Sequence, residues 1–192
     1  MNPDIERELI PHSDTVRMIG ELQGLSSRLK HACTQLELLD AAGHVPASPD
    51  FSVLIHHAET AQALSRDVVQ LTSAFAQTAH STNRAGSTVL SHLAIAGTMS
   101  CSAAPLFAQT AETALALPQS HGTSDRQQME GRMVVDHATA RAYLRRASES
   151  LREAVKELHG HLDFHRFFPA SMRQGTATPP PPPPPRQSPH TR

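Results

Sequence analysis

The stretch from Met133 to Leu162 constrains the fold more than any other part of this 192-residue chain. Its apolar residues are spaced alternately four and three apart, which is the pattern of a helix that packs along its whole length on other helices. These residues are Met133, His137, Ala140, Leu144, Ala147, Leu151, Ala154 and Leu158. The sequence therefore predicts an all-α fold in which one long helix is the best-specified element.

Three further stretches carry the same spacing and predict three more long helices. In the first it comprises Met18, Leu22, Leu25, Leu29, Ala32, Leu36 and Leu39. In the second, which has one three-three step, it comprises Phe51, Leu54, Ala58, Ala61, Leu64, Val68, Leu71 and Phe75. In the third it comprises Leu93, Ala96, Ser100, Ala103, Phe107, Thr110, Ala114 and Leu117. With the helix-capping signals, these patterns predict helices over residues 13–42, 50–82, 87–117 and 125–167.

The helix boundaries are predicted from capping residues and helix breakers. Residues suited to an N-terminal cap precede each helix, and these are Ser13 with Asp14, Ser48 or Asp50, Ser87 or Thr88, and Ser124 with Asp125. Gly43 is placed to end the first helix, and Pro169 to end the last. Pro105 removes one backbone hydrogen bond from the third helix, so this helix either kinks there or restarts as a second segment, and we expect a kink.

Long helices of matched length joined by short links favour an antiparallel up-down-up-down four-helix bundle. We expect this bundle to occupy residues 13–169, after an N-terminal extension of residues 1–12. A composition change then marks residues 170–192 as a disordered proline-rich tail. The sequence thus predicts one folded domain with an unfolded segment at its C-terminal side.

The tail contains the candidate partner-binding residues. A run of prolines forms a polyproline II rod, which aromatic-lined grooves bind at little entropic cost, and a flanking arginine can orient it through an acidic partner. These residues are Pro179, Pro180, Pro181, Pro182, Pro183, Pro184, Pro185 and Arg186. The alternative is a spacer without a dedicated receptor.

Charge and cysteine usage limit the class of protein. Seventeen basic residues face eighteen acidic ones, so the net charge of −1 gives no field to attract nucleic acid. Cys33 and Cys101 are predicted to differ in height along the bundle by roughly 10 Å, which is too far for a disulfide. Because the N-terminal residues also lack the apolar run of a signal peptide, we expect a cytoplasmic protein. Polar residues within the apolar window from Val89 to Phe107 argue against a membrane span.

A histidine-rich stretch near the end of the last helix is a candidate metal site. It contains His159, His161, Asp163 and His165. The spacing resembles the HxHxDH zinc signature of metallo-β-lactamase-fold hydrolases, but Phe164 precedes the last histidine and the sequence predicts no strands for that sheet sandwich. On a helix, His161 and His165 share one face, and a third ligand has to come from another helix. The alternative is a helix end whose histidines complement the helix dipole.

Two other histidines suggest phosphotransfer. The segment from Asp136 to Arg141, which contains His137, resembles the dimerisation helix of sensor histidine kinases, although no nucleotide-binding motif follows it. The segment from His92 to Gly97 resembles the histidine signature of phosphotransfer domains, without its lysine. Against this, the position of His137 among the apolar residues predicts a packed histidine that has a hydrogen-bond partner.

No other motif predicts an enzyme or a cofactor site. Acidic pairs such as Glu153 and Glu157 lie among basic residues, which is typical of a solvated helix face, and there is no glycine-rich phosphate loop. A strip of Arg141, Arg145, Arg146 and Arg152 is likewise typical of a solvated face. We therefore predict a non-enzymatic interaction or scaffold protein without a cofactor, which binds a helical or proline-binding protein partner or forms a homodimer. The alternatives are a phosphotransfer-like signalling bundle and a histidine-rich metal-binding bundle.

Overall fold

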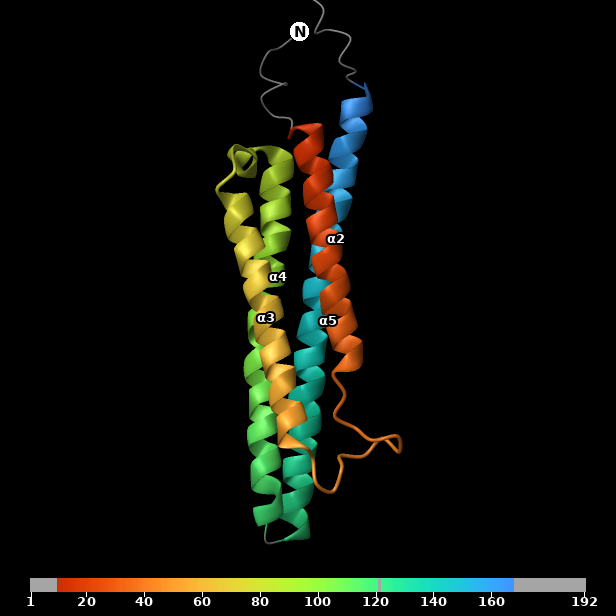
Figure 1. Cartoon of the computed structure of the whole chain (residues 1–192), viewed down its shortest axis with the longest axis vertical. Coiled ribbons are helices and arrows are strands. Elements are labelled where there is room, and N and C mark those ends of the chain that lie inside the picture. The colour runs from red at the N-terminus through yellow and green to blue at the C-terminus, as the bar shows by residue number, and fades with distance from the viewer. Residues whose placement is uncertain (1–9, 121, 168–192) are drawn as a thin grey trace, which may run out of the picture.

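A computed structural model of the chain describes residues 10–120 and 122–167, and these form a bundle of four long helices (Figure 1). The helices are α2 (His12–Gln35), α3 (Phe51–Ala76), α4 (Arg84–Ala116) and α5 (Thr123–Phe167). Two short 3-10 helices, η1 (Ala79–Thr82) and η2 (Leu117–Gln119), follow α3 and α4. Successive long helices run in opposite directions, as the sequence predicts. Both the N-terminal extension up to residue 9 and the predicted proline tail lie outside the described residues.

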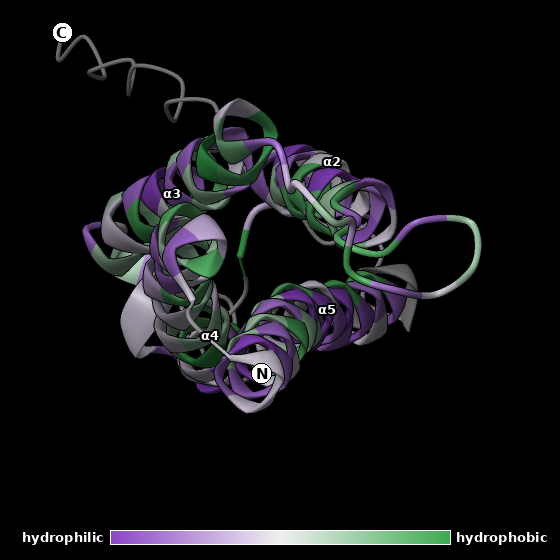
Figure 2. Cartoon of the chain, turned by 90° about the horizontal axis from the view of Figure 1, so that it is seen from below, coloured by the Kyte–Doolittle hydropathy of each residue, from purple (hydrophilic) through white to green (hydrophobic). Residues whose placement is uncertain are grey.

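The four helices surround a common centre, and their packing is uneven (Figure 2). Helix α5 packs extensively on α4 and α2, and α3 packs on α4. Helices α2 and α3 are consecutive in the chain but have much less contact with each other. An exposed ion pair between Arg28 and Asp67 links them. Helix α2 therefore owes its position mainly to α5.

The predicted core positions of α4 and α5 are confirmed. Every residue of the four-three pattern in α5 is buried, from Met133 to Leu158, and so is every residue of the pattern that begins at Leu93 in α4 and ends at Leu117, the first residue of η2. Both patterns contain small residues, which let the two helix backbones approach closely. The two helices can therefore pack along most of their length.

Two buried serines join α2 to α5. The Ser26 hydroxyl donates to the Ser148 carbonyl at 3.1 Å, and the Ser148 hydroxyl donates to the Ser26 carbonyl at 2.9 Å. These reciprocal bonds satisfy both buried hydroxyls and hold the two backbones together. They also fix the height of α2 against α5.

Helix α2 ends at Gln35, seven residues before the predicted end near Ala42. Leu36 adopts an extended backbone, and this turns Leu38 into a second apolar cluster that includes Leu54 and Met133. Leu39, the last predicted core residue of α2, is 41% exposed. Tertiary burial of Leu38 thus takes precedence over the local helical pattern.

The chain then makes a tight turn at residues 40–44. The Asp40 carboxylate accepts hydrogen bonds from the backbone N–H groups of Ala42 and His44, at 2.9 and 3.0 Å. These bonds hold the pKa of Asp40 below its ordinary value, and the bond from His44 has the largest effect. Gly43 has a φ of 80°, a left-handed backbone conformation that glycine adopts more readily than other residues. It therefore serves this turn and is not the C-terminal stop of α2.

The caps of the next two helices agree with the prediction in one case and differ in the other. Asp50 caps α3 by accepting from the Ser52 N–H at 2.8 Å. Helix α4 begins at Arg84, earlier than predicted, and is capped by Asn83, which accepts from the Gly86 N–H at 2.7 Å. The predicted caps at Ser87 and Thr88 therefore lie inside the helix.

Helix α2 also starts earlier than predicted. Pro11 occupies its N-terminal cap position, and no side chain there accepts a hydrogen bond. Ser13 and Asp14 lie inside the first turn. The Thr15 hydroxyl donates to the Pro11 carbonyl at 3.0 Å instead. The predicted cap is therefore wrong.

Helix α4 continues through Pro105 as a single α-helix. The alternative of a restart at this proline is therefore excluded, and the expected kink stays a prediction.

By length and composition alone, residues 84–119 are apolar enough to cross a membrane. In the bundle these residues include the fully buried Ser100 and Thr110, whose hydroxyls donate to carbonyls one turn earlier in α4.

Cys33 is buried, Cys101 is exposed, and both are free thiols.

Candidate functional site

The most unusual group in the bundle interior is a pair of histidines. His57 of α3 and His137 of α5 are 5% and 3% exposed. Their ring nitrogens, Nδ1 of His57 and Nε2 of His137, are 3.3 Å apart and form a buried hydrogen bond. One imidazole donates and the other accepts, so the pair is satisfied when both rings are neutral.

Phe107 of α4 adds a third ring beside the two histidines. Its ring packs edge-on against both imidazoles, with centroid distances of 5.0 Å to His137 and 5.8 Å to His57. Three helices thus place three rings in one layer of the core. The layer is closed to solvent, because Phe107 is fully buried.

Burial determines the protonation of the pair. The pKa of His137 is lowered from 6.5 to about 4, mainly by burial and then by the neighbouring His57 and the positive charge of Arg141. The pKa of His57 is also lowered, first by burial and then by His56 and Arg141. Both imidazoles are consequently neutral at physiological pH.

Arg141 joins this layer to α2. Its Nε donates a 2.7 Å hydrogen bond to the backbone carbonyl of Cys33, in the last turn of α2. This carbonyl is one of the last carbonyls of α2, which have no hydrogen-bond donor within the helix. Arg141 is therefore a half-buried cap on α2, whereas Arg145, Arg146 and Arg152 are exposed.

The prediction that His137 is a packed histidine with a hydrogen-bond partner is confirmed. His57, its partner, was missed by sequence reasoning. The signal was present, because His57 lies three residues after Leu54 and one before Ala58, on the buried side of α3. The second phosphotransfer candidate, His92, is half-buried, and its backbone carbonyl accepts a hydrogen bond from Ser150 of α5 at 2.9 Å.

The histidine-rich end of α5 has a structural contact at His161. Its Nε2 accepts a 3.0 Å hydrogen bond from the backbone N–H of Ile10, just before α2, and the side chain is buried. Within the described residues, no three side chains of the metal-binding types come together. His159 and Asp163 are exposed, and the side chain of His165 lies outside the described residues.

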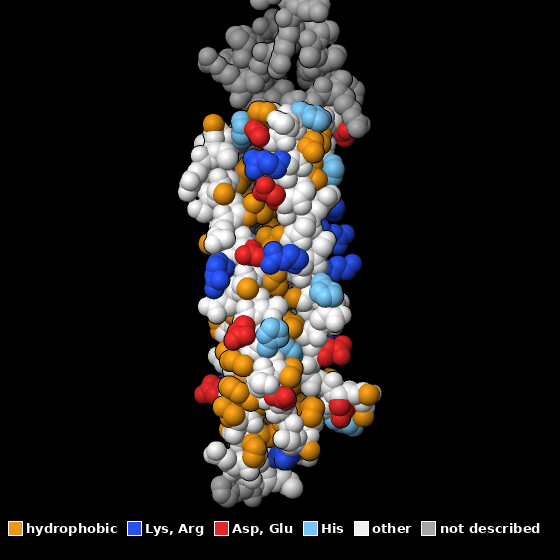
Figure 3. All heavy atoms as spheres, in the orientation of Figure 1, with side chains coloured by type: hydrophobic (Ala, Val, Ile, Leu, Met, Phe, Trp, Pro, Cys, Tyr) orange, Lys and Arg blue, Asp and Glu red, His pale blue; other side chains and the backbone are white. Residues whose placement is uncertain are grey.

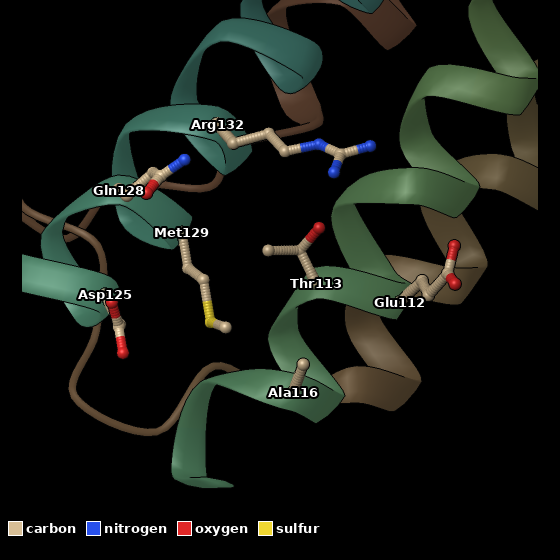
Figure 4. A pocket seen from close by; sticks show the side chains of 7 residues that line it. All are labelled: Glu112, Thr113, Ala116, Asp125, Gln128, Met129 and Arg132. Carbon is tan, nitrogen blue, oxygen red and sulfur yellow. The ribbon is translucent and has the colours of Figure 1, made fainter. Parts of the chain in front are cut away.

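A pocket of about 380 Å³ lies between the last turns of α4 and the first turns of α5 (Figure 4). Arg132 of α5 extends towards α4, and Thr113 and Met129 point into the space between the helices. Glu112 and Asp125 add two carboxylates at the rim. Arg132 already pairs with Asp136 at 3.5 Å, so the pocket has no arrangement selective for one ligand.

A larger groove of about 760 Å³ runs between α3 and α4 on the outside of the bundle. Its lining is largely apolar and carries no formal charge. From α3 it includes Val69, Thr72, Ser73 and Ala76, and from α4 it includes Leu93, Ala94, Gly97, Thr98, Cys101, Ser102 and Pro105. The Cys101 thiol lies 3.0 Å from the Ser65 hydroxyl of α3, so it points towards α3.

Hydrophobic side chains also gather at the end of the bundle where α3 begins (Figure 3). The exposed ones there are Leu39, Phe51 and Val53. Phe51, a predicted core residue of α3, is 38% exposed because α2 ends before it can cover this turn. The predicted partner-binding residues from Pro179 to Arg186 lie outside the described residues.

No family model, curated protein or solved structure matches this chain.

Proposed function

We propose that this protein is a non-enzymatic interaction module that binds protein through the outer face of α3 and α4. The observation that carries the proposal is the absence of charge from this face. Between Asp67 and Glu112 the chain contains one formally charged residue, Arg84. We refer to residues 68–76 of α3 and 85–111 of α4, with the groove between them, as the uncharged face.

The exposed side of α4 makes this absence unusual. Long surface helices of soluble proteins normally carry charged residues on the side turned to water. Helix α4 instead turns Ala94, Ile95 and Thr98 outwards, and Ile95 is 50% exposed. Val69, which lines the groove from α3, is 47% exposed. Apolar surface of this extent is characteristic of a site that binds protein.

The geometry of the histidines supports a binding role over the two alternatives. A phosphoryl acceptor has to present its imidazole to a partner active site, and His137 is enclosed by His57 and Phe107. In the metal-binding alternative, His161 needs a free ring nitrogen, and its Nε2 already accepts from Ile10. The two alternatives therefore have less support than the interaction module.

The proline tail supplies a second binding element in this proposal. The run of prolines from Pro179 to Pro185, for which the sequence predicts a polyproline II conformation, and the following Arg186 suit a partner with an aromatic groove and an acidic rim. Tethering two binding elements in one chain raises the effective concentration of the second once the first is engaged. The bundle would then act as a scaffold between two partners.

Affinity capture from an extract of the source cells tests this function. Four baits are compared: the full chain, a chain that ends at Gly175, Thr98→Glu in the uncharged face, and the control Ser27→Glu on the exposed side of α2. We expect Thr98→Glu to lose one set of partners and the truncation to lose another, each confirmed by titration with the purified protein. Identical binding by all four baits would contradict the proposal.

A further inference from the structure

The absence of charge limits what can bind to the uncharged face. A charged partner surface would lose water on contact and find no opposite charge, at a net cost in free energy. The outer side of α5, by contrast, alternates Arg145, Glu149, Arg152 and Glu153. The partner must therefore present an uncharged surface of its own, of similar length.

This chain itself provides such a surface. In a two-fold symmetric contact the same patch is used on both copies, so the uncharged face meets an identical uncharged face. The groove and the exposed side chains of Val69 and Ile95 also give one surface both hollows and projections. Self-contact thus matches charge and shape without a second kind of surface.

The face is large enough for a small dimer interface. Residues 85–111 of α4 extend for about 40 Å, and residues 68–76 of α3 for about 13 Å, at 1.5 Å per residue. Each helix contributes a strip about 10 Å wide, the usual interaxial distance, so the face measures on the order of 500 Å² per copy. A symmetric contact then buries about 1,000 Å² in total, which is the least that a specific protein interface needs.

We propose that a second copy of this chain covers the uncharged face, with the two α4 helices antiparallel across a two-fold axis. The proposal rests on the interaction function above and names the partner of the same surface. The middle residue of the stretch 85–111 is Thr98, which is exposed. The axis passes close to Thr98, so the two Thr98 side chains face each other.

Cys101 lies three residues from this axis. Its two copies are then separated by about 9 Å along the helix direction, which is farther than disulfide geometry allows. Position 98, at the axis itself, is the place where two cysteines would be close enough to bond. The proposal therefore specifies which residue cross-links and which does not.

The first experiment measures mass in solution by light scattering and sedimentation of the full chain. We expect a dimer for the wild type and for Ser27→Glu, with a micromolar or lower Kd. Thr98→Glu places two carboxylates against each other at the axis and should raise the Kd at least 100-fold. Far-UV circular dichroism and the Tm establish that each variant is folded. A monomeric wild type at about 100 µM would overturn the proposal.

The second experiment maps the geometry by oxidation. Thr98→Cys is combined with Cys101→Ser, and the matched control is Glu149→Cys with Cys101→Ser, on the charged side of α5. Cys33 is buried in both proteins. Mild oxidation should join the Thr98→Cys protein into a covalent dimer and leave the control monomeric on non-reducing gels. Equal cross-linking of both would overturn the proposed axis.

Other occupants of the face give distinct results. Binding of the wild type, but not of Thr98→Glu, to neutral phosphatidylcholine vesicles would assign the face to a bilayer and overturn the dimer. A monomer that captures a different protein in a Thr98→Glu-sensitive way would overturn the dimer and leave the interaction function intact. A dimer that Thr98→Glu does not affect would overturn this interface.

Discussion

The buried histidine pair makes the stability of the bundle depend on pH. The pKa of His137 is about 4 in the folded chain, against an ordinary value of 6.5. Between these values the unfolded state binds a proton that the folded state does not, so the free energy of unfolding rises with pH. This stability is complete above about pH 6.5 and is lost as the pH falls towards 4. Because of His137, we expect the free energy of unfolding to be about 2 kcal/mol lower at about pH 5 than at about pH 7.5, as measured by urea denaturation.

Replacing both histidines separates their polar role from their packing role. His57→Leu with His137→Leu removes both buried polar groups together, so we expect stability at neutral pH to be unchanged or higher. His137→Leu alone leaves His57 buried without a partner and should cost about 1–3 kcal/mol. The double variant should also flatten the pH dependence between pH 4 and 6.5. A double variant that keeps the full pH dependence would show that other histidines cause it.

At the scale of elements, the turn between α3 and α4 depends on one glycine. A Cβ on Gly86 would overlap the His80 backbone carbonyl, whereas a Cβ on Gly20, an exposed position of α2, meets no atom within 4 Å. We expect Gly86→Ala to lower the free energy of unfolding by about 1–3 kcal/mol. Gly20→Ala should raise it by about 0.5–1 kcal/mol, because alanine favours the helix. Thermal unfolding of the two variants measures both; a neutral Gly86→Ala would mean that the turn can move.

The elements most accurately predicted from sequence are those whose periodicity and packing agree. In α4 and α5 the spacing of residues such as Leu93 and Leu144 directly matches burial, because these helices pack along most of their length. The end of α2 could not be predicted, because Leu38 is drawn into a cluster built by distant segments. The burial of His57 could be predicted from its place beside Ala58, but its pairing with His137 could not, since the pairing depends on the relative height of α3 and α5.

At the scale of the whole molecule, the most exposed connection between the described helices is the segment between α2 and α3. Residues 36–50 include an exposed turn at 40–44, and α2 has little contact with α3. We expect elastase, which cleaves after small residues such as Ala41 and Ala42, to cut this segment before the other connections between the described helices. Because α2 is held by α5, the two fragments should co-elute on size exclusion and be identified by mass spectrometry. First cleavage at residues 77–83 would contradict this assignment.

The hydrogen bond from Ile10 to His161 places the two ends of the described chain at the same end of the bundle. The order in which the helices are synthesised is therefore separable from the order in which they pack. A circularly permuted gene could begin at Asp50, run through α5, and continue by a short glycine-serine link into Ile10 and α2. Such a chain would keep every helix beside its present neighbours and would place its new termini in the segment that contains the exposed turn at 40–44.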